Sequence, residues 1–167
     1  RDHQTASSDR LLLFDLSVGG HHPGYILHLI QYWNQQELSG YLDIVVLPEF
    51  MEQHNDVVDI AEKYGQIKTR FVPITQKERG FLSSRANFFS RKRLNFQEWG
   101  LFCKYAKLLK TTQALLMYFD TYQLPLFLGH NPPCPYTTKY FRPRFHYKDF
   151  KYYRSSRQER WDKKKKK

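Results

Sequence analysis

The segment LLLFDLSVGGHHPGYILHLIQYW, residues 11–33, decides the fold. Residues 11–15 form an apolar run without alternation, which is typical of a strand buried on both faces. The turn-forming residues that follow are Gly19, Gly20, Pro23 and Gly24. Across residues 25–36 the apolar side chains then recur at helical spacing. The segment therefore predicts a buried strand, a glycine-rich turn and a helix in direct succession.

The rest of the chain repeats this alternation. The further segments expected to form strands are 42–47, 69–74, 114–119 and, after a proline-rich stretch, 140–147. A helix is expected over 56–64, with Asn55 as its cap, and another over 96–113. Residues 75–93 are polar and irregular, which indicates a long surface loop or a mobile helix. Because strands and helices alternate, we predict an α/β fold: an open, parallel, Rossmann-like sheet with helices on both faces.

The charge of the chain divides it into two parts. The net charge is +11 over 167 residues, and residues 137–167 hold 13 of the 27 Lys and Arg but only 3 of the 16 Asp and Glu. We therefore expect one domain over residues 10–147 and a basic, disordered tail over residues 148–167. The lysine run at residues 163–167 need not have a specific role, because a solvated tail or an accident of the coding sequence also explains it.

The composition also bears on location and cofactors. Cys103 and Cys134 give neither a disulfide framework nor a metal-binding spacing, and such sparse cysteine use suits a reducing cytoplasm. No stretch approaches the roughly 20 apolar residues that a membrane span needs, and the polar N-terminal residues lack the apolar core of a signal peptide. We expect a cytoplasmic protein without a cofactor or metal, with peripheral contact at the inner membrane face left open.

The glycine-rich turn is the strongest candidate for a binding site. Ligands of open parallel sheets bind at the carboxyl ends of the strands, and Gly19, Gly20 and Gly24 let the backbone approach a ligand there. His21 and His22 can form hydrogen bonds with hydroxyls or a phosphate, whereas adjacent histidines rarely converge on one metal ion. The spacing GGHHPG differs from the dinucleotide fingerprint GxGxxG, and the chain has no P-loop. A turn that only joins strand to helix is the alternative.

Two further polar residues are expected at the same edge of the sheet. Asp120 follows the strand expected at 114–119, where it is a candidate for the binding site or, equally, a helix cap. His146 lies near the end of the strand expected at 140–147, and its alternative role is structural, since aromatic residues flank it.

The segment at residues 11–33 resembles the opening of GT-B glycosyltransferases of the family-4 and family-1 type. Two later stretches, LLMYFDTYQLPLFLG at residues 115–129 and KYFRPRFHY at residues 139–147, resemble the later strands of these enzymes and their connection. The resemblance covers residues 10–147. It implies that the chain is the N-terminal, acceptor-side domain of a transferase that takes sugar from a nucleotide-sugar donor.

The resemblance also implies roles for individual residues. Gly19 and Gly20 match the glycines of the family's first loop, and Asp120 falls where the family has polar residues that line the acceptor site. His146 matches a histidine near the transferring sugar and becomes the candidate catalytic residue. His21, His22 and Gly24 belong to a loop that departs from the more common acidic or Arg-containing one. The identity of the acceptor therefore stays open between a lipid-linked compound and a polysaccharide.

The donor side of such an enzyme is not recognisable in the sequence. GT-B enzymes hold the nucleotide sugar mainly in a second Rossmann domain, and catalysis needs both halves of the cleft. We therefore expect a truncated, inactive fragment, which meets a nucleotide sugar only if a second domain is present.

Two other classes of function remain as alternatives. Aromatic residues interleave with Arg and Lys in residues 137–167, which favours a binding module for nucleic acid or an anionic membrane surface; they include Tyr140, Phe141, Phe145, Tyr147, Tyr152 and Tyr153. A stand-alone nucleotide-binding Rossmann protein is the other alternative, although the dinucleotide fingerprint is missing.

Overall fold

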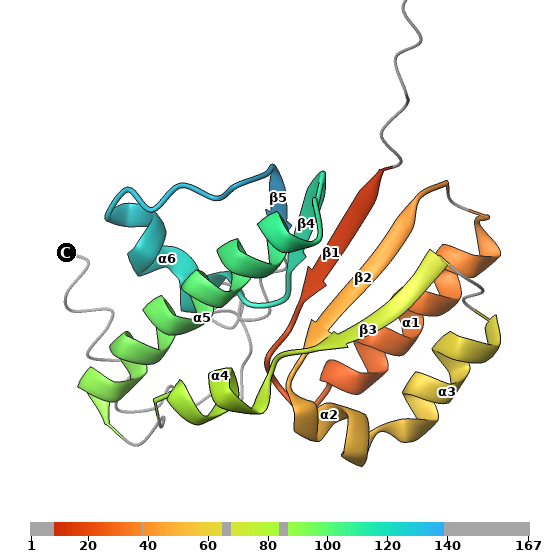
Figure 1. The fold of residues 1–167 in the computed structure, drawn as a ribbon, viewed down its shortest axis with the longest axis horizontal. Coiled ribbons are helices and arrows are strands. Elements are labelled where there is room, and N and C mark those ends of the chain that lie inside the picture. Colours follow the sequence, from red (N-terminus) through yellow and green to blue (C-terminus); the bar gives the residue numbers. More distant parts are fainter. Residues whose placement is uncertain (1–8, 38, 65–67, 84–86, 139–167) are drawn as a thin grey trace, which may run out of the picture.

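The computed structural model describes residues 9–37, 39–64, 68–83 and 87–138. These residues form one sheet of five strands, which are β1 (Arg10–Phe14), β2 (Tyr41–Val46), β3 (Thr69–Pro73), β4 (Gln113–Leu116) and β5 (Tyr136–Thr138). The spatial order is β3-β2-β1-β4-β5, and every neighbouring pair is parallel (Figure 1). The predicted α/β fold with an open, parallel, Rossmann-like sheet is confirmed.

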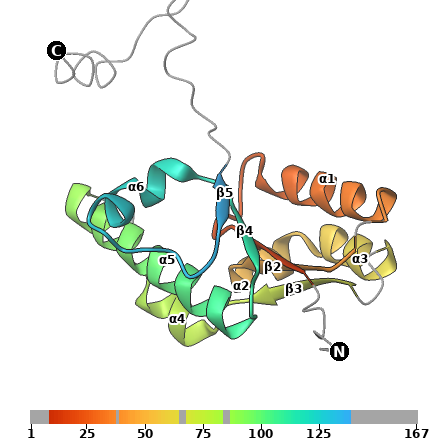
Figure 2. The ribbon, with the colours of Figure 1, turned by 90° about the horizontal axis from the view of Figure 1, so that it is seen from above.

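Helices cover both faces of this sheet. The helices of the described residues are α1 (His22–Gln35), α2 (Pro48–Gln53), α3 (Asn55–Tyr64), α4 (Gln76–Phe81), α5 (Phe88–Leu108) and α6 (Phe119–Phe127). Figure 2 shows α1 and α3 on one side of the sheet and α5 and α6 on the other. The sheet is thus buried between two helical layers, as the sequence predicts.

Strand β1 contributes to both hydrophobic cores. Leu12 and Phe14 belong to the core under α5, and Leu13 belongs to the core under α1. All three side chains are fully buried, because successive side chains of a strand point to opposite faces and both faces are covered. This burial explains why the opening run of the sequence is apolar without alternation.

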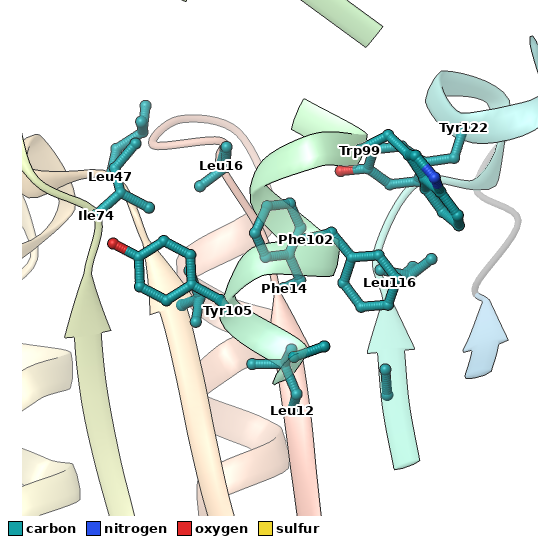
Figure 3. Packing of buried hydrophobic residues seen from close by; sticks show 13 residues of the cluster. Leu12, Phe14, Leu16, Leu47, Ile74, Trp99, Phe102, Tyr105, Leu116 and Tyr122 are labelled. Atoms are coloured by element: carbon teal, nitrogen blue, oxygen red, sulfur yellow. The ribbon is translucent and has the colours of Figure 1, made fainter. Parts of the chain in front are cut away.

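Aromatic rings dominate the core under α5. Phe102 lies between Phe14 and Trp99, with ring centroids 5.7 and 5.1 Å away, and Tyr122 of α6 adds a further ring beside Trp99 (Figure 3). Each large ring buries much apolar area, so this core anchors α5 and α6 firmly to the sheet.

The strand order defines a topological switch point at the carboxyl edge of the sheet, where the connections from two neighbouring strands leave in opposite directions. From β1 the chain passes through α1 to β2 on one side, whereas α5 returns it to β4 on the other side of β1. The connections that leave β1 and β4 therefore diverge, which opens the region where ligands of such sheets bind.

Two helices begin earlier than predicted. Helix α1 begins at His22 instead of Tyr25, because Pro23 is compatible with a first helical turn. Helix α5 begins at Phe88, about two turns before the expected helix at 96–113, and ends at Leu108. Its start is set by a capping box between Asn87 and Ser90.

The stretch 75–93 is more regular than predicted. Instead of a loop or a mobile helix, it contains α4 and the first turn of α5. A capping box between Thr75 and Glu78 starts α4, and the fixed contacts of Glu78 with α5 hold it in place. The polar composition of α4 and of the first turns of α5 reflects helices that are largely exposed.

The region after β4 also differs from the prediction. Strand β4 ends at Leu116, so the expected strand at 114–119 is too long, and Asp120 lies in the first turn of α6. Helices α2 and α6 and strand β5 were not expected from the sequence. The strand expected at 140–147 and the tail at 148–167 lie outside the described residues.

Candidate functional site

The candidate site lies at the switch point between the carboxyl ends of β1 and β4. The loop from β1 to α1 supplies one side, and Tyr118, which follows β4, supplies the other. Because β1 and β4 are hydrogen-bonded neighbours, residues that follow them in the chain meet at one place.

A buried hydrogen bond between Asp15 and His22 organises the β1–α1 loop. The backbone N–H of Asp15 donates to the Val45 carbonyl at 3.1 Å, which holds Asp15 on the sheet. Its carboxylate Oδ2 lies 2.5 Å from Nδ1 of His22, and Oδ1 accepts from the backbone N–H of Ser17 at 3.0 Å. A carboxylate only accepts, so Nδ1 carries the proton and Nε2 of a neutral ring is left as the acceptor.

The ring of His22 spans the switch point. Its centroid lies 4.8 Å from that of Tyr118, and the two planes are tilted by 34°. The same ring therefore contacts Asp15, which directly follows β1, and Tyr118, which follows β4. Both Asp15 and His22 are more than nine-tenths buried, so the pair is a fixed element of the loop.

A second histidine holds the loop from the side of β2. Nε2 of His54, which follows α2, donates to the Val18 carbonyl at 2.7 Å. The His54 ring in turn packs on Phe50 of α2, with centroids 4.9 Å apart. The loop is thus anchored at Asp15 and at Val18, and the three residues after Val18 are exposed.

The exposed part of the loop is made of Gly19, Gly20 and His21. A Cβ added at either glycine meets no described atom within 4 Å, so open space lies above the backbone. Gly20 has φ +70°, a left-handed conformation in which an L side chain is strained. The loop therefore offers its backbone to an approaching ligand.

The N-terminal end of α1 is free of side-chain caps. His21 is the N-cap and forms no side-chain cap bond, and the first turn holds no acidic residue. Helices α4 and α5, by contrast, each start with a complete capping box. Unsatisfied N–H groups at a helix start attract hydroxyl oxygens or anions.

A third polar cluster lies near this edge, after β3. Oε2 of Glu78 accepts from the phenol of Tyr105 at 2.8 Å, and Oε1 accepts from Nζ of Lys104 at 2.5 Å. Burial opposes ionisation of Glu78, but the bonds from Lys104, Thr75 and Tyr105 prevail and lower its pKa to about 2. Burial and the neighbouring Glu78 carboxylate raise the pKa of Tyr105 to about 12. The cluster joins α4 to α5, and its groups satisfy one another.

The structure separates the predicted site residues into three groups. Gly19, Gly20, His21 and Gly24 are exposed on one loop and the first helical turn. His22 is on the same turn but buried against Asp15. Asp120 follows Tyr118 in the first turn of α6, after the strand next to β1, and His146 lies outside the described residues.

Sequence reasoning missed three residues of this arrangement, Asp15, His54 and Tyr118. Only Asp15 carries a usable signal, since an aspartate that directly follows a fully buried strand needs a hydrogen-bonding partner. The roles of His54 and Tyr118 depend on which strand and helix ends become neighbours in space.

A comparison with models of protein families and with curated proteins finds no match for the chain. Among the described residues, no helix is long and apolar enough to cross a bilayer, and no three His, Cys, Asp or Glu side chains gather as metal ligands would. The interpretation of the site thus depends on its geometry and on the residues of the loop.

Proposed function

We propose that this chain is the acceptor-binding, Rossmann-like domain of a GT-B glycosyltransferase. The observation that carries the proposal is the β1–α1 loop at the switch point, exposed at its glycines and fixed beneath them by the Asp15–His22 pair. The resemblance of residues 11–33 to the opening of these enzymes supports the same assignment.

The parts of the loop have different tasks in this proposal. The backbone N–H groups at Gly19 and Gly20 and the imidazole of His21 bind hydroxyls of the sugar acceptor, which can donate and accept hydrogen bonds in turn. His22 is a positioning residue, because its ring is buried and sets the path of the loop. Asp120 and His146 keep their predicted roles at the acceptor and at the transferring sugar.

The donor side is supplied by another domain in this proposal. The reacting sugar of a GT-B enzyme lies between two Rossmann domains, and orientation by both contributes much of the rate. We therefore expect the 167-residue chain alone to bind saccharides weakly and to transfer no sugar. We propose a cytoplasmic location, which the two free thiols suit.

Saturation-transfer NMR with a panel of mono- and disaccharides tests the acceptor site. We expect signals for at least one saccharide, lost or strongly reduced in His21→Ala. His28→Ala is the matched control, because His28 is a second exposed histidine of the same helix. It should leave the signals unchanged.

A calorimetric titration with UDP- and GDP-sugars tests whether this domain binds the acceptor and leaves the donor to another domain. Affinity weaker than the millimolar range is expected. A micromolar dissociation constant that depends on the glycine loop would contradict the proposal, since the loop would then hold the nucleotide and not the acceptor.

A further inference from the structure

The two cysteines of the chain lie against the same hydrophobic core. Cys103 belongs to α5, and Cys134 belongs to the segment that joins α6 to β5. Both side chains pack on the core under α5, and both are only partly buried, so neither residue is sealed from solvent. The chain has no other cysteine, so an intramolecular disulfide could join only these two.

The α6–β5 segment runs along one face of α5. Phe96, Trp99 and Cys103 lie three and four residues apart, so they share this face of the helix. The ring of Phe96 meets that of His130 with centroids 5.7 Å apart, and the ring of Trp99 meets that of Tyr136 at 6.5 Å. Ring contacts on either side of Cys134 thus hold the segment against the helix (Figure 2).

The backbone places Cys134 near the last turns of α5. The carbonyl of the next residue, Pro135, accepts from the backbone N–H of Ala114 at 2.9 Å, at the start of β4. Helix α5 ends at Leu108, and a short connection leads from there into β4. Cys103 lies within the last two turns of that helix. The pairing at the start of β4 therefore brings Cys134 toward the part of α5 that carries Cys103.

The ionisation of one thiol affects the other. Burial raises the pKa of the Cys103 thiol, and the cation of Lys107, one turn later, opposes this rise. Burial also raises the pKa of the Cys134 thiol, and a negative charge on Cys103 raises it further. Such an effect requires the two sulfurs to be near each other. Cys103 therefore loses its proton first and is the attacking thiol.

We infer that Cys103 and Cys134 form a reversible disulfide that fastens the α6–β5 segment to α5 under oxidising conditions. The co-reactant is a small disulfide of the glutathione type. This inference goes beyond the proposed function and does not depend on it, since it uses only the packing of the segment on α5.

The reaction is two successive thiol–disulfide exchanges. The Cys103 thiolate attacks one sulfur of the small disulfide, whose S–S bond breaks and releases a thiolate. The Cys134 thiolate then attacks the Cys103 sulfur of this mixed disulfide, and a second small thiolate leaves. The two released thiolates take up the two protons that the cysteines have lost. The cysteine pair is thus oxidised by two electrons, and the small disulfide is reduced to two thiols.

The segment between α6 and β5 is the part of the described fold that such a bond stabilises most. Of residues 127–135 only Pro132 and Cys134 are not exposed, and the strand that follows, β5, has three residues. A segment with so little buried surface opens locally at a low cost in free energy. The same freedom lets it adjust to the Cα separation of about 5.5 Å that a disulfide requires.

The bond also restrains one side of the candidate site. It closes a loop over residues 103–134, which contains β4 and α6 and therefore Tyr118, the residue that meets His22. Oxidation holds this side of the switch point to α5, whereas a reducing cytoplasm leaves the two thiols open.

The test is equilibration of the full, reduced chain with mixtures of reduced and oxidised glutathione, with and without urea, followed by alkylation and intact-mass measurement. We expect a monomer that has lost two hydrogens, carries no glutathione and resists alkylation. The equilibrium constant for its formation should be at least about tenfold larger without urea, because the fold holds the two thiols together. Proteolytic digestion should then release one disulfide-linked peptide pair, which contains Cys103 and Cys134.

Thermal unfolding measures what the bond does to the fold. The Tm of the oxidised protein should exceed that of the reduced protein by about 5 °C or more, and it should fall back on reduction. Cys103→Ser and Cys134→Ser are the matched controls, and the same oxidising treatment should not raise their Tm. Amide hydrogen exchange over residues 127–138 should slow at least about threefold on oxidation of the parent chain.

Three results would overturn the inference. Each cysteine could retain a glutathione without closing the bond, or the disulfide could form only between two chains. The equilibrium constant could be no larger without urea than with it, which would show that the fold does not bring the thiols together. The oxidised monomer could melt at or below the Tm of the reduced one, which would show that the bond distorts the fold instead of fastening it.

Discussion

Asp15 and Asp43 belong to neighbouring strands of the same sheet, and both carboxylates are almost completely buried. Asp43 of β2 pairs with Nη1 of Arg10 at 3.0 Å and with Nε of Arg70, so that β1, β2 and β3 are tied together. Both side-chain partners of Asp43 are guanidinium groups, whose fixed N–H donors match a carboxylate.

Asp15 has a different set of partners at the carboxyl end of β1. It binds one imidazole and one backbone N–H, and its partner His22 contacts Tyr118 across the switch point. The imidazole ring of His22 holds a loop with exposed residues instead of a strand. One buried carboxylate thus stabilises the sheet, whereas the other shapes the β1–α1 loop.

The largest effect should come from breaking the Asp43 cluster. We expect Asp43→Asn to lower the free energy of unfolding by about 3 kcal/mol, because two cations lose their buried partner. Urea unfolding followed by circular dichroism measures the change. Asp59→Asn, on the exposed side of α3, is the control and should change stability by less than about 0.5 kcal/mol. A loss below about 1 kcal/mol for Asp43→Asn would mean that the arginines are sufficiently hydrated without it.

Breaking the Asp15–His22 pair should lower the stability less than breaking the Asp43 cluster does, but it should weaken saccharide binding more. A double-mutant cycle of Asp15→Asn and His22→Ala should give a coupling energy of about 2 kcal/mol, as for a hydrogen bond to a charged group. Saccharide signals in NMR should fall in every member of the cycle, because the loop loses its anchor. Additive effects on stability would show that the two residues act independently.

Glu78 is a further carboxylate with fixed partners, and its contribution to stability should depend on pH. Its carboxyl has a folded-state pKa of about 2 against an ordinary value of 4.5, so its contribution is complete above pH 4.5 and disappears as the pH falls toward 2. We expect Glu78→Gln to cost roughly 1.5 kcal/mol at pH 6 and much less at pH 2.5, where most of the pH-dependent contribution is already lost. Urea unfolding at a series of pH values gives both numbers. A constant difference between variant and parent across this range would contradict the role of its charge.

Two glycines of the loop should give the smallest effects, with opposite signs. Gly20→Ala should cost about 1 kcal/mol, because alanine is strained at φ +70°. Gly24→Ala, in the first turn of α1 with open space around it, should stabilise the protein by about 0.5 kcal/mol. If Gly24 is used for binding, the stabilised variant should nevertheless lose saccharide signals in NMR.

Strands β1, β2 and β3 could be predicted from the sequence with good accuracy, whereas β4 was expected to be longer and β5 was not expected at 136–138. The segments around Leu12, Ile44 and Val72 are apolar because their strands are buried in a sheet, and the structure places strands there. Short elements were harder to recognise. Helices α2 and α6 each span fewer than ten residues, and Pro125 inside α6 conceals its helical pattern.

The candidate site could be predicted only in part. The glycines indicate a turn at the end of β1, and the adjacent histidines indicate hydrogen-bonding side chains there. The difference between His21 and His22 could not be predicted, because one residue of helical rotation moves a side chain from solvent to the interior.

By itself, the sequence determined the alternation of strands and helices, the buried central strand and the glycine turn that follows it, because these depend on local patterns of apolar and turn-forming residues. The tertiary structure alone decided that β4 lies beside β1 and that Tyr118 therefore meets His22. It also decided that Asp43 stabilises three strands while Asp15 holds a loop. The reason is physical: a hydrogen-bond partner or a ring contact depends on which segments become neighbours in space, and residues as far apart as 22 and 118 carry no local signal of that contact.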